Sequence, residues 1–224
     1  MTKAATRRRT RQGEETYRTI LSAAVDIASV EGLEGLSIGR LANEMNMSKS
    51  GLFAHFGSKE GLQLATVDAA RNIFIEHVFK PALTEPRGLL RLWKFCDAWL
   101  THLEKEIFQG GCFFLAASAE FDGRPGPVRD KIAENMKDWV DALEYSVRQS
   151  QEAGQIDQAI DATQLAFELH ALSIAANWSF QLYGDAQACN RARFGILSKL
   201  NSVVTPIAPA LPSIDSFTVS NTSN

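Results

Sequence analysis

Residues 37–60 constrain the fold of this chain more than any other segment, because they combine two short helices with a tight turn. The first helix has apolar residues at i, i+3, i+4 and i+7, and Ser37 stands where it can cap the N-terminus. Asn46 and Met47 follow as the turn, and Ser48 can cap the second helix. A helix-turn-helix has this outline, with its second helix in the major groove of DNA. The segment therefore predicts that the chain binds a DNA duplex.

The outer face of the predicted second helix supplies groups that can read DNA. Leu52 and Phe56 point inward at helical spacing, which leaves four residues outside: Lys49, Ser50, Phe53 and His55. Lys49 can donate to guanine acceptors and Ser50 can donate or accept, whereas Gly51 has no side chain to block a close approach. The alternative interpretation is a solvated polar face on a small helical bundle.

Residues 14–66 resemble the DNA-binding domain of the TetR family of one-component transcriptional regulators. The most specific part is the family pattern Ser-Lys-x-x-Leu-Tyr-x-His-Phe-x-Ser-Lys-Glu, which this chain matches at Ser48, Lys49, Leu52, His55, Phe56, Ser58, Lys59 and Glu60. The chain departs from the pattern at Phe53, where the family usually carries a tyrosine that bonds a DNA phosphate. The resemblance implies that Ser37, His55 and Lys59 contact phosphates and position the protein on the duplex.

The charge distribution places the positive end of the chain at the same segment. The net charge is −3, but residues 1–59 carry +3 and the remainder carries −6. Residues 1–12 contain the Arg7 to Arg11 cluster and no apolar period, so we expect a disordered basic arm. The arm can enter a minor groove or raise affinity through counterion release, and its alternative role is that of a solubilising tail.

Helical periodicity continues beyond this segment without a period-2 strand pattern, so we predict an all-α fold of about nine helices. An N-terminal three-helix helix-turn-helix DNA-binding domain is expected at residues 13–57, and a C-terminal helical ligand-binding and dimerisation domain at residues 58–205. Residues 206–224 are rich in Pro, Ser, Thr and Asn and are expected to form a disordered tail. No apolar run reaches the ~20 residues of a membrane span, and the N-terminus lacks a signal-peptide core, which favours a cytoplasmic protein without a membrane partner.

Two helices expected at about 162–183 and 186–204 indicate how the chain assembles. The first helix is apolar on nearly every face. A helix at the surface of a monomer needs only one apolar stripe, the one that faces the core. We therefore expect it to pack on a partner chain. In the resembled family the two C-terminal helices pair with those of a second subunit in a four-helix bundle, so the resemblance implies a homodimer.

Large aromatic residues are frequent in the second half of the chain, although aromatic stripes at helical spacing are usually ordinary core. The resemblance implies a cavity for a small, mostly apolar effector, with His170 or another polar group fixing its orientation. The predicted lining consists of Cys96, Trp99, Phe113, Ala117, Trp139, Phe167 and His170. No motif indicates a metal site or a cofactor.

Cys112 follows two glycines at a predicted helix start, where the helix dipole can lower the pKa of its thiol. A thiol sensor, or an enzyme in which Cys112 acts with His102 or His170, is therefore an alternative, and a small buried residue is the competing interpretation. No phosphate-loop, metal-ligand or nucleophile-elbow motif supports an enzyme, and we expect no catalytic residues. The leading hypothesis is a homodimeric repressor that leaves a pseudopalindromic operator when an effector binds. Its other alternative is a helical ligand-binding protein with a weakened DNA reader.

Overall fold

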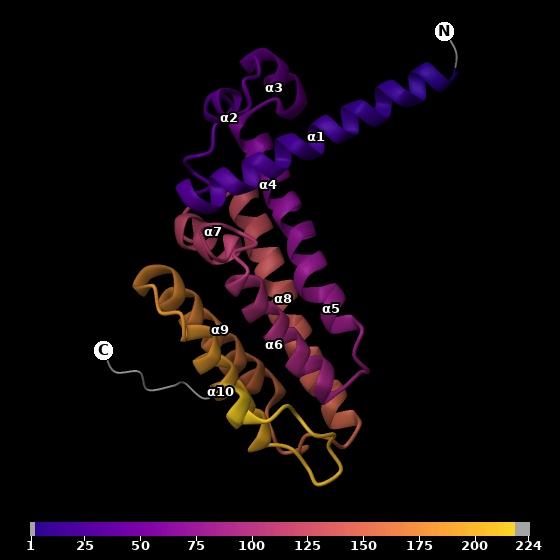
Figure 1. The fold of residues 1–224 in the computed structure, drawn as a ribbon, viewed down its shortest axis with the longest axis vertical. Helices are drawn as coiled ribbons and strands as arrows, with labels where there is room; N and C mark the ends of the chain where they lie inside the picture. Colours follow the sequence, from indigo (N-terminus) through magenta and orange to yellow (C-terminus); the bar gives the residue numbers. More distant parts are fainter. Residues whose placement is uncertain (1–2, 218–224) are drawn as a thin grey trace. The chain divides into compact units, whose positions relative to one another are not determined.

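The computed structural model describes residues 3–217, and helices make up its architecture (Figure 1). In chain order they are α1 (Lys3–Glu31), α2 (Ile38–Met45), α3 (Lys49–Phe56), α4 (Lys59–Phe74), the π-helical segment η1 (Ile75–Phe79), α5 (Lys80–Leu83), α6 (Leu89–Glu104), α7 (Phe113–Phe121), α8 (Pro127–Glu152), α9 (Ala162–Tyr183), α10 (Ala188–Asn201) and the 3₁₀ turn η2 (Ile214–Phe217). With α4, η1 and α5 counted as one continuous run, the α-helices of the described residues number nine. No β-strand occurs between residues 3 and 217, where Ile156 and Val204 form an isolated antiparallel bridge. The all-α prediction is confirmed.

The chain folds as two compact units. The first unit contains the described residues up to Asn72 together with Phe108–Ala133. The second unit contains Ile73–Ile107 together with the described residues from Glu134 onward. The limits between the units fall inside α4 and α8, so each of these helices contributes residues to both units. The domain limits at residues 57 and 205 stay predictions.

Side-chain caps and a left-handed residue set the helix-turn-helix of the first unit. Ser37 Oγ accepts a hydrogen bond from the Arg40 amide at 3.1 Å, and Ser48 Oγ accepts one from the Gly51 amide at 3.1 Å. Between the two helices Asn46 has a φ of 53°, which asparagine adopts more readily than most residues. The structure therefore has both caps and the turn where the sequence predicts them.

The core of the second unit lies where α6 packs against α9 and α10. Helices α9 and α10 run side by side in opposite directions (Figure 1). Helices α6 and α10 each bury apolar residues at helical spacing, among them Leu89, Leu92, Cys96, Leu100, Cys189, Ile196 and Leu200. Helix α9 buries one side only, through residues such as Leu165, Leu169 and Ala176. Its other side is not covered by the described residues of the chain.

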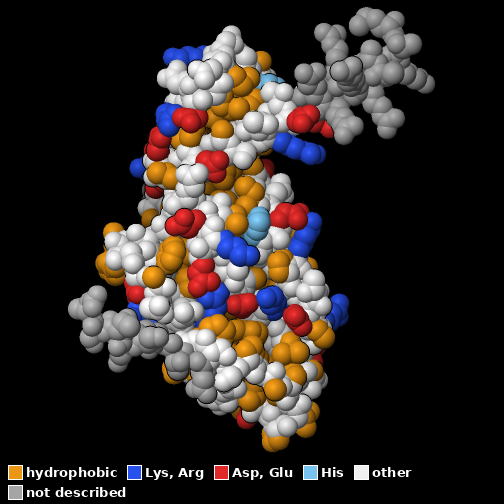
Figure 2. All heavy atoms as spheres, in the orientation of Figure 1, with side chains coloured by type: hydrophobic (Ala, Val, Ile, Leu, Met, Phe, Trp, Pro, Cys, Tyr) orange, Lys and Arg blue, Asp and Glu red, His pale blue; other side chains and the backbone are white. Residues whose placement is uncertain are grey.

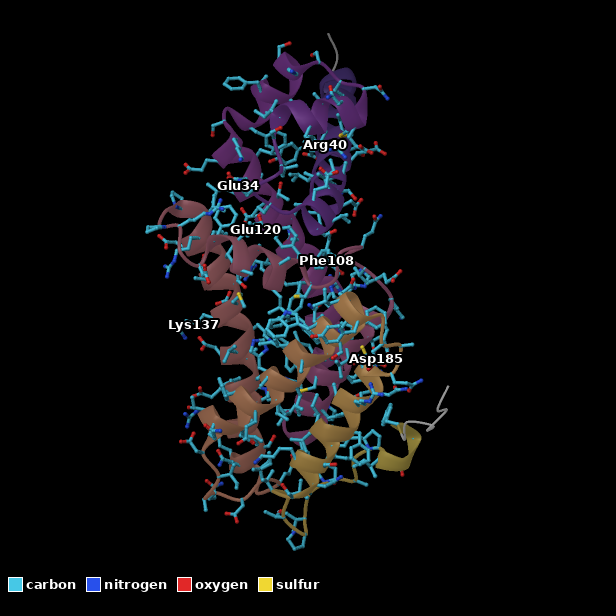
Figure 3. All side chains as sticks on the ribbon, turned by 90° about the vertical axis from the view of Figure 1, so that its left-hand side faces the viewer. Glu34, Arg40, Phe108, Glu120, Lys137 and Asp185 are labelled. Carbon is cyan, nitrogen blue, oxygen red and sulfur yellow. The ribbon has the colours of Figure 1, made fainter. Side chains whose placement is uncertain are left out.

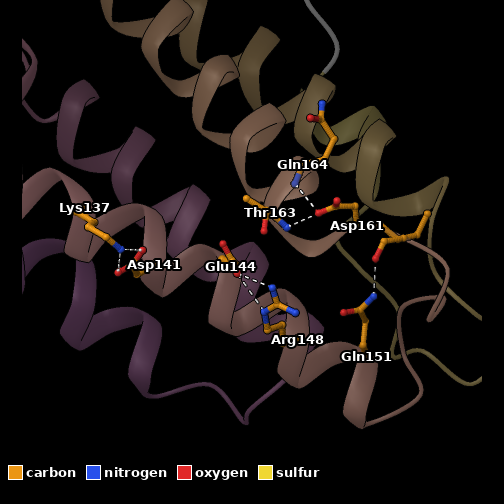
Figure 4. Close-up of polar contacts among 9 residues, drawn as sticks. Lys137, Asp141, Glu144, Arg148, Gln151, Asp161, Thr163 and Gln164 are labelled. Carbon is orange, nitrogen blue, oxygen red and sulfur yellow. Dashed lines mark hydrogen bonds and ion pairs between the residues drawn. The ribbon is translucent and has the colours of Figure 1, made fainter.

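The connection from α8 to α9 is fixed by polar contacts (Figure 4). Gln151 Nε2 donates a hydrogen bond to the Ile160 carbonyl oxygen at 2.8 Å. Asp161 then caps α9, because its Oδ1 accepts hydrogen bonds from the amides of Thr163 and Gln164 at 2.9 and 3.1 Å. Ion pairs four residues apart line the exposed face of α8 in the same view, Lys137 with Asp141 and Glu144 with Arg148.

The N-terminal segment differs from the sequence prediction. A disordered arm is predicted at residues 1–12, but α1 already begins at Lys3, and only residues 1 and 2 lie outside the described residues. Arginine and alanine are good helix formers, and extending an existing helix needs no new nucleation. A basic composition therefore does not prevent this segment from being helical.

The C-terminal segment also differs from the prediction of a disordered tail at residues 206–224. The Phe217 ring lies 6.0 Å from the Trp93 ring of α6, and the Arg193 guanidinium of α10 lies 5.7 Å from the centre of the Phe217 ring. The part of the tail up to residue 217 is therefore folded against the second unit, whereas residues 218–224 lie outside the described residues. The prediction relied on the average composition of the tail, which does not show that the single aromatic residue Phe217 packs on the folded unit.

Candidate nucleic-acid interface and effector site

Helix α3 presents the residues that the sequence assigns to DNA reading. Lys49, Ser50, Phe53 and His55 are exposed, whereas Leu52 is fully buried. Phe53 is 55 % exposed, which is a large exposure for a phenylalanine ring. Helix α3 therefore offers one solvent-facing surface with a cation, a hydroxyl and an aromatic ring.

Ser37 and Gly51 lie at the N-terminal ends of α2 and α3, respectively. A Cβ on Gly51 would lie 3.0 Å from Ser48 Oγ, so a larger residue would press on the cap of α3. Ser37 is half-buried, and its hydroxyl already serves as the cap of α2. As a capping residue Ser37 satisfies the amide of Arg40, one of the N-terminal amides of α2 that have no partner within the helix.

The ammonium of Lys59 forms an ion pair in the turn before α2. Lys59 Nζ lies 2.9 Å from Glu34 Oε1, and Arg124 Nη1 lies 3.5 Å from the other oxygen of the same carboxylate. The hydrogen bond from Lys59 is the main reason why the pKa of Glu34 is below its usual value. A phosphate that binds Lys59 must therefore share the cation with Glu34.

His55 belongs to a small aromatic group that joins α3 to α1. Its ring centroid lies 5.9 Å from that of Tyr17, and the Tyr17 ring stacks on Phe56 at 5.6 Å. The imidazole remains exposed at the end of α3. The contact with Tyr17 thus fixes the position of His55 without removing it from solvent.

A carboxylate from α7 holds the turn between α1 and α2, a contact that the sequence analysis did not predict. Glu120 accepts hydrogen bonds from the amides of Leu33 at 3.0 Å and Glu34 at 2.8 Å, and Figure 3 shows Glu120 beside Glu34. Gly32 has a φ of 87°, and a Cβ there would lie 2.9 Å from Glu120 Oε1. Glu120 is the only charged residue of α7, and this lone charge is the sequence signal for such a role.

The loop before α7 makes a second close contact with α1. A Cβ on Gly110 would lie 1.6 Å from the carbonyl oxygen of Ser29, so only glycine allows the two backbones to approach this closely. Gly110 and Glu120 together fasten α7 to the C-terminal end of α1 within the first unit. Residues distant in sequence therefore support the helix-turn-helix.

We expect Glu120→Ala to lower the free energy of unfolding by about 1–3 kcal/mol, because two backbone amides lose a charge-assisted acceptor. Amide hydrogen exchange at Leu33 and Glu34 should become faster, and urea denaturation measures the loss of stability. Asp130→Ala is the matched control, since it removes a carboxylate with 69 % side-chain exposure from the same unit. Unchanged exchange at Leu33 and Glu34 would show that Glu120 does not hold the turn.

Cys112 precedes α7 but is buried, with 5 % of its surface exposed. Burial raises the pKa of the thiol to about 11, although the amides of Leu115 and Phe114 lower it in part. Burial likewise raises the pKa of Cys96 to about 12. A protonated, buried thiol is a poor nucleophile, so the structure favours the small buried residue over the thiol sensor or the catalytic cysteine.

We expect Cys112 in the folded protein to react slowly with a thiol reagent such as Ellman's reagent at pH 8, and quickly once the protein is denatured. The pKa in the folded protein lies above the ordinary value of 9.0, so ionisation of the thiol favours the unfolded chain. The stability contributed by this group is present below about pH 9 and is lost as the pH rises toward 11. Rapid modification of the native protein that Cys112→Ser abolishes would contradict this assignment.

Aromatic rings of the second unit gather around Trp139. Its ring centroid lies 5.5 Å from that of Phe74, 6.0 Å from Phe79 and 6.0 Å from Phe95. Trp139 Nε1 donates a hydrogen bond to His170 Nδ1 at 3.2 Å. Burial lowers the pKa of His170, which keeps the imidazole neutral and able to accept this bond.

His102 extends the same cluster. It is 4 % exposed, and its ring centroid lies 5.8 Å from Phe74 and 5.9 Å from His77. Burial, and secondly the charge of His77, lower the pKa of His102 to about 4. The imidazoles of His102 and His170 are therefore neutral at neutral pH, which suits an apolar ligand.

The residues predicted to line the effector cavity fall into three groups. Cys96, Trp99 and Trp139 are buried and His170 is half-buried in the second unit, whereas Phe113 and Ala117 are buried in the first. Phe167 is 64 % exposed on the outer side of α9 and lies apart from the buried residues, so its place in the cavity stays a prediction. A helix that is apolar on nearly every face does not reveal from its sequence which face is buried. Phe74 and Phe79 are members of the aromatic cluster that the sequence analysis missed.

Two negative findings concern the described part of the chain. Within it, no group of three or more His, Cys, Asp or Glu side chains is placed to hold a metal ion. None of the helices between residues 3 and 217 has the length and apolar character needed to cross a membrane.

A capped helix-turn-helix with an exposed second helix, followed by an all-helical region, defines the class of DNA-binding transcriptional regulators. Residues 20–66 match the family of bacterial regulatory proteins named after tetR, and residues 88–196 match the tetracyclin repressor-like C-terminal domain. The chain therefore belongs to the TetR family. No curated protein matches the chain.

Solved structures of other regulators share the fold. A TetR transcriptional regulator from Chloroflexus aurantiacus J-10-FL is 23% identical, with a TM-score of 0.80 over 87% of this chain and 98% of that one. A TetR-family regulator from Cytophaga hutchinsonii is 18% identical, with a TM-score of 0.76 over 87% and 97% of the two chains. AibR, solved in complex with isovaleryl coenzyme A and operator DNA, is 22% identical, with a TM-score of 0.63 over 81% and 96%. Identities this low show a common fold.

Proposed function

We propose that this regulator is a homodimeric repressor that binds a pseudopalindromic operator and releases it when a small, mostly apolar effector binds. The observation that carries the proposal is the surface of α3, which exposes Lys49, Ser50 and Phe53 beside the capped start of α2. A helix with this exposure can enter a major groove, where Lys49 donates to guanine and Ser50 bonds a neighbouring base edge. His55 and Lys59 would contact phosphates at the rim of the groove.

Basic residues outside α3 would add affinity without reading sequence. The Arg7 to Arg11 cluster lies at the start of α1, and residues 1–59 carry a net charge of +3. Cations near the phosphates release counterions when the complex forms, so binding should weaken as the salt concentration rises. The salt dependence distinguishes a DNA-binding surface from a merely solvated polar face.

The uncovered side of α9 supports the dimer. Phe167, Trp178 and Leu182 are spaced at 11 and 4 residues, which places them on one face, and each is at least 63 % exposed. Phe194 of α10 is 43 % exposed, and Figure 2 shows hydrophobic side chains at the surface beside the turn between α9 and α10. A contiguous apolar surface of this kind is typical of a protein interface, and a two-fold axis would pair it with itself.

The aromatic cluster around Trp139 is the proposed effector site of the second unit. Apolar rings would contact the body of the effector. Since Nδ1 of a neutral His170 accepts from Trp139, its proton lies on Nε2, which can donate to an acceptor on the effector. AibR, which has the same fold, was solved with isovaleryl coenzyme A, and a small apolar acyl group is therefore one effector class to test first.

The proposal is tested by binding the purified protein to a fragmented library of genomic DNA at two salt concentrations and sequencing the retained fragments. We expect enrichment of one inverted repeat, weaker binding at the higher salt, and weaker enrichment with Lys49→Ala. Lys137→Ala is the matched control, because it removes an exposed lysine of α8 that lies outside the proposed DNA-binding surface. Retention that is independent of sequence and of Lys49 would contradict the repressor.

A further inference from the structure

A hollow in the first unit lies directly beside the exposed ring of α3. It is lined by Ile38 and Gly39 from the start of α2 and by Lys49, Ser50 and Phe53 from α3. Ile38 and Phe53 give this hollow an apolar wall, and Lys49 and Ser50 give it a polar edge. The surface expected to face DNA therefore contains a site for a small apolar group next to hydrogen-bonding side chains.

Helix geometry places the polar and the apolar groups of this hollow on one face. Phe53 follows Ser50 by three residues and Lys49 by four, the spacings at which side chains on a helix are neighbours. A Cβ on Gly39 would lie 3.5 Å from Lys49 Cε, so any side chain at this position would fill part of the hollow. Gly39 keeps the hollow open, and Lys49 lies along its edge.

The chemistry of the major groove offers one apolar group that such a site can contact. Base edges there present donors and acceptors, and among the four standard bases only thymine adds a C5-methyl group. Phenylalanine has no hydroxyl, so Phe53 cannot donate a hydrogen bond to a phosphate as a tyrosine can. Binding is most favourable when the exposed ring contacts another apolar group, because both surfaces are then removed from water.

We propose that Phe53, together with Ile38, reads the C5-methyl of a thymine beside the base that Lys49 contacts. The inference rests on the proposed binding of operator DNA and names a determinant of its sequence. Each half of an inverted repeat then contains one thymine whose methyl group enters the hollow. Loss of a single buried methyl group corresponds to roughly a three- to tenfold loss of affinity per half-site.

The test uses the full-length protein and a duplex selected from a random library. Each thymidine of the selected site is replaced in turn by deoxyuridine, which removes the methyl group and leaves the base pairing unchanged. We expect one position per half-site at which wild-type binding weakens roughly three- to tenfold. Phe53→Ala should bind more weakly and lose this dependence, whereas Lys49→Ala should bind more weakly and retain it.

The outcomes separate this inference from the proposed function. Specific binding without any dependence on a thymine methyl would overturn the role of Phe53 and leave the repressor in place. A methyl dependence that persists in Phe53→Ala would assign the readout to another residue and likewise overturn it. If no specific duplex is selected, both the operator and the readout by Phe53 are rejected.

Discussion

Replacing Phe167 and Trp178 together with lysine is expected to convert the protein into a monomer and to weaken operator binding at least about 100-fold. Both side chains lie on the uncovered face of α9, where they are 64 % and 63 % exposed. Because most of each side chain is exposed in the single chain, the replacements should leave the fold unchanged. The mass in solution should approach 24.6 kDa, the mass of one chain, as measured by sedimentation velocity or light scattering.

The size of the effect follows from the symmetry of the interface. A buried aromatic residue at the centre of an interface contributes about 2–4 kcal/mol, and a two-fold axis places each replaced residue in the interface twice. Four replaced side chains would therefore cost about 8 kcal/mol or more, which weakens dimerisation by nearly a millionfold. A monomer holds only one half of an inverted repeat and loses the benefit of binding two linked half-sites.

Tyr145→Lys provides the matched control, because Tyr145 is an aromatic residue of similar exposure, 59 %, that belongs to α8 and not to α9. This variant should remain dimeric and bind the operator as the wild type does. Circular dichroism should show the same helix content for all three proteins. If the double variant remained a dimer, the interface would have to lie elsewhere than on α9 and α10.

The helix-turn-helix was predictable because its determinants are local. A serine at each N-cap and an asparagine at the turn act within three or four residues, and the structure has Ser37, Ser48 and Asn46 in these roles. The span of α9 was predictable for a similar reason, since Asp161 and Gly184 stand at its two ends. Such signals need no knowledge of the rest of the fold.

Contacts between distant segments were not predictable from local patterns. Glu120 accepts hydrogen bonds from the amides of Leu33 and Glu34, which lie more than 80 positions away. A single glutamate in an apolar helix does not indicate which residues it will contact. The outward position of Phe167 depends on which side of α9 meets α6 and α10. The docking of Phe217 on Trp93 similarly depends on where the tail passes. Each is decided by tertiary packing.

Replacing Arg193 is expected to lower the stability of the fold strongly, because its guanidinium is a buried cation. The sequence pattern of α10 does not reveal this burial. The side chain of Arg193 is 6 % exposed. It reaches Asp97 at 2.9 Å, both oxygens of Glu104 at 2.6 and 2.8 Å, and the Thr101 hydroxyl at 3.0 Å. One residue of α10 thereby holds three residues of α6, and its guanidinium also faces the ring of Phe217.

We expect Arg193→Met to lower the free energy of unfolding by about 3 kcal/mol, at the low end of the cost of breaking a buried ion pair. Methionine fills much of the space but leaves the carboxylates of Asp97 and Glu104 without their main cation. The low end applies because these carboxylates keep some contact with water, with side-chain exposures of 20% and 34%. The melting temperature should fall by roughly 6–12 °C, which differential scanning calorimetry measures.

The cause of the loss can be isolated by removing the stranded charges as well. In the Arg193→Met background, Asp97→Asn and Glu104→Gln should recover most of the stability, since the site then contains no uncompensated carboxylate. Arg191→Ala is the matched control, because Arg191 is an exposed neighbour on α10 whose ion pair with Asp185 lies at the surface, and its loss should change the melting temperature little. If the triple variant were no more stable than Arg193→Met alone, lost packing rather than stranded charge would explain the effect.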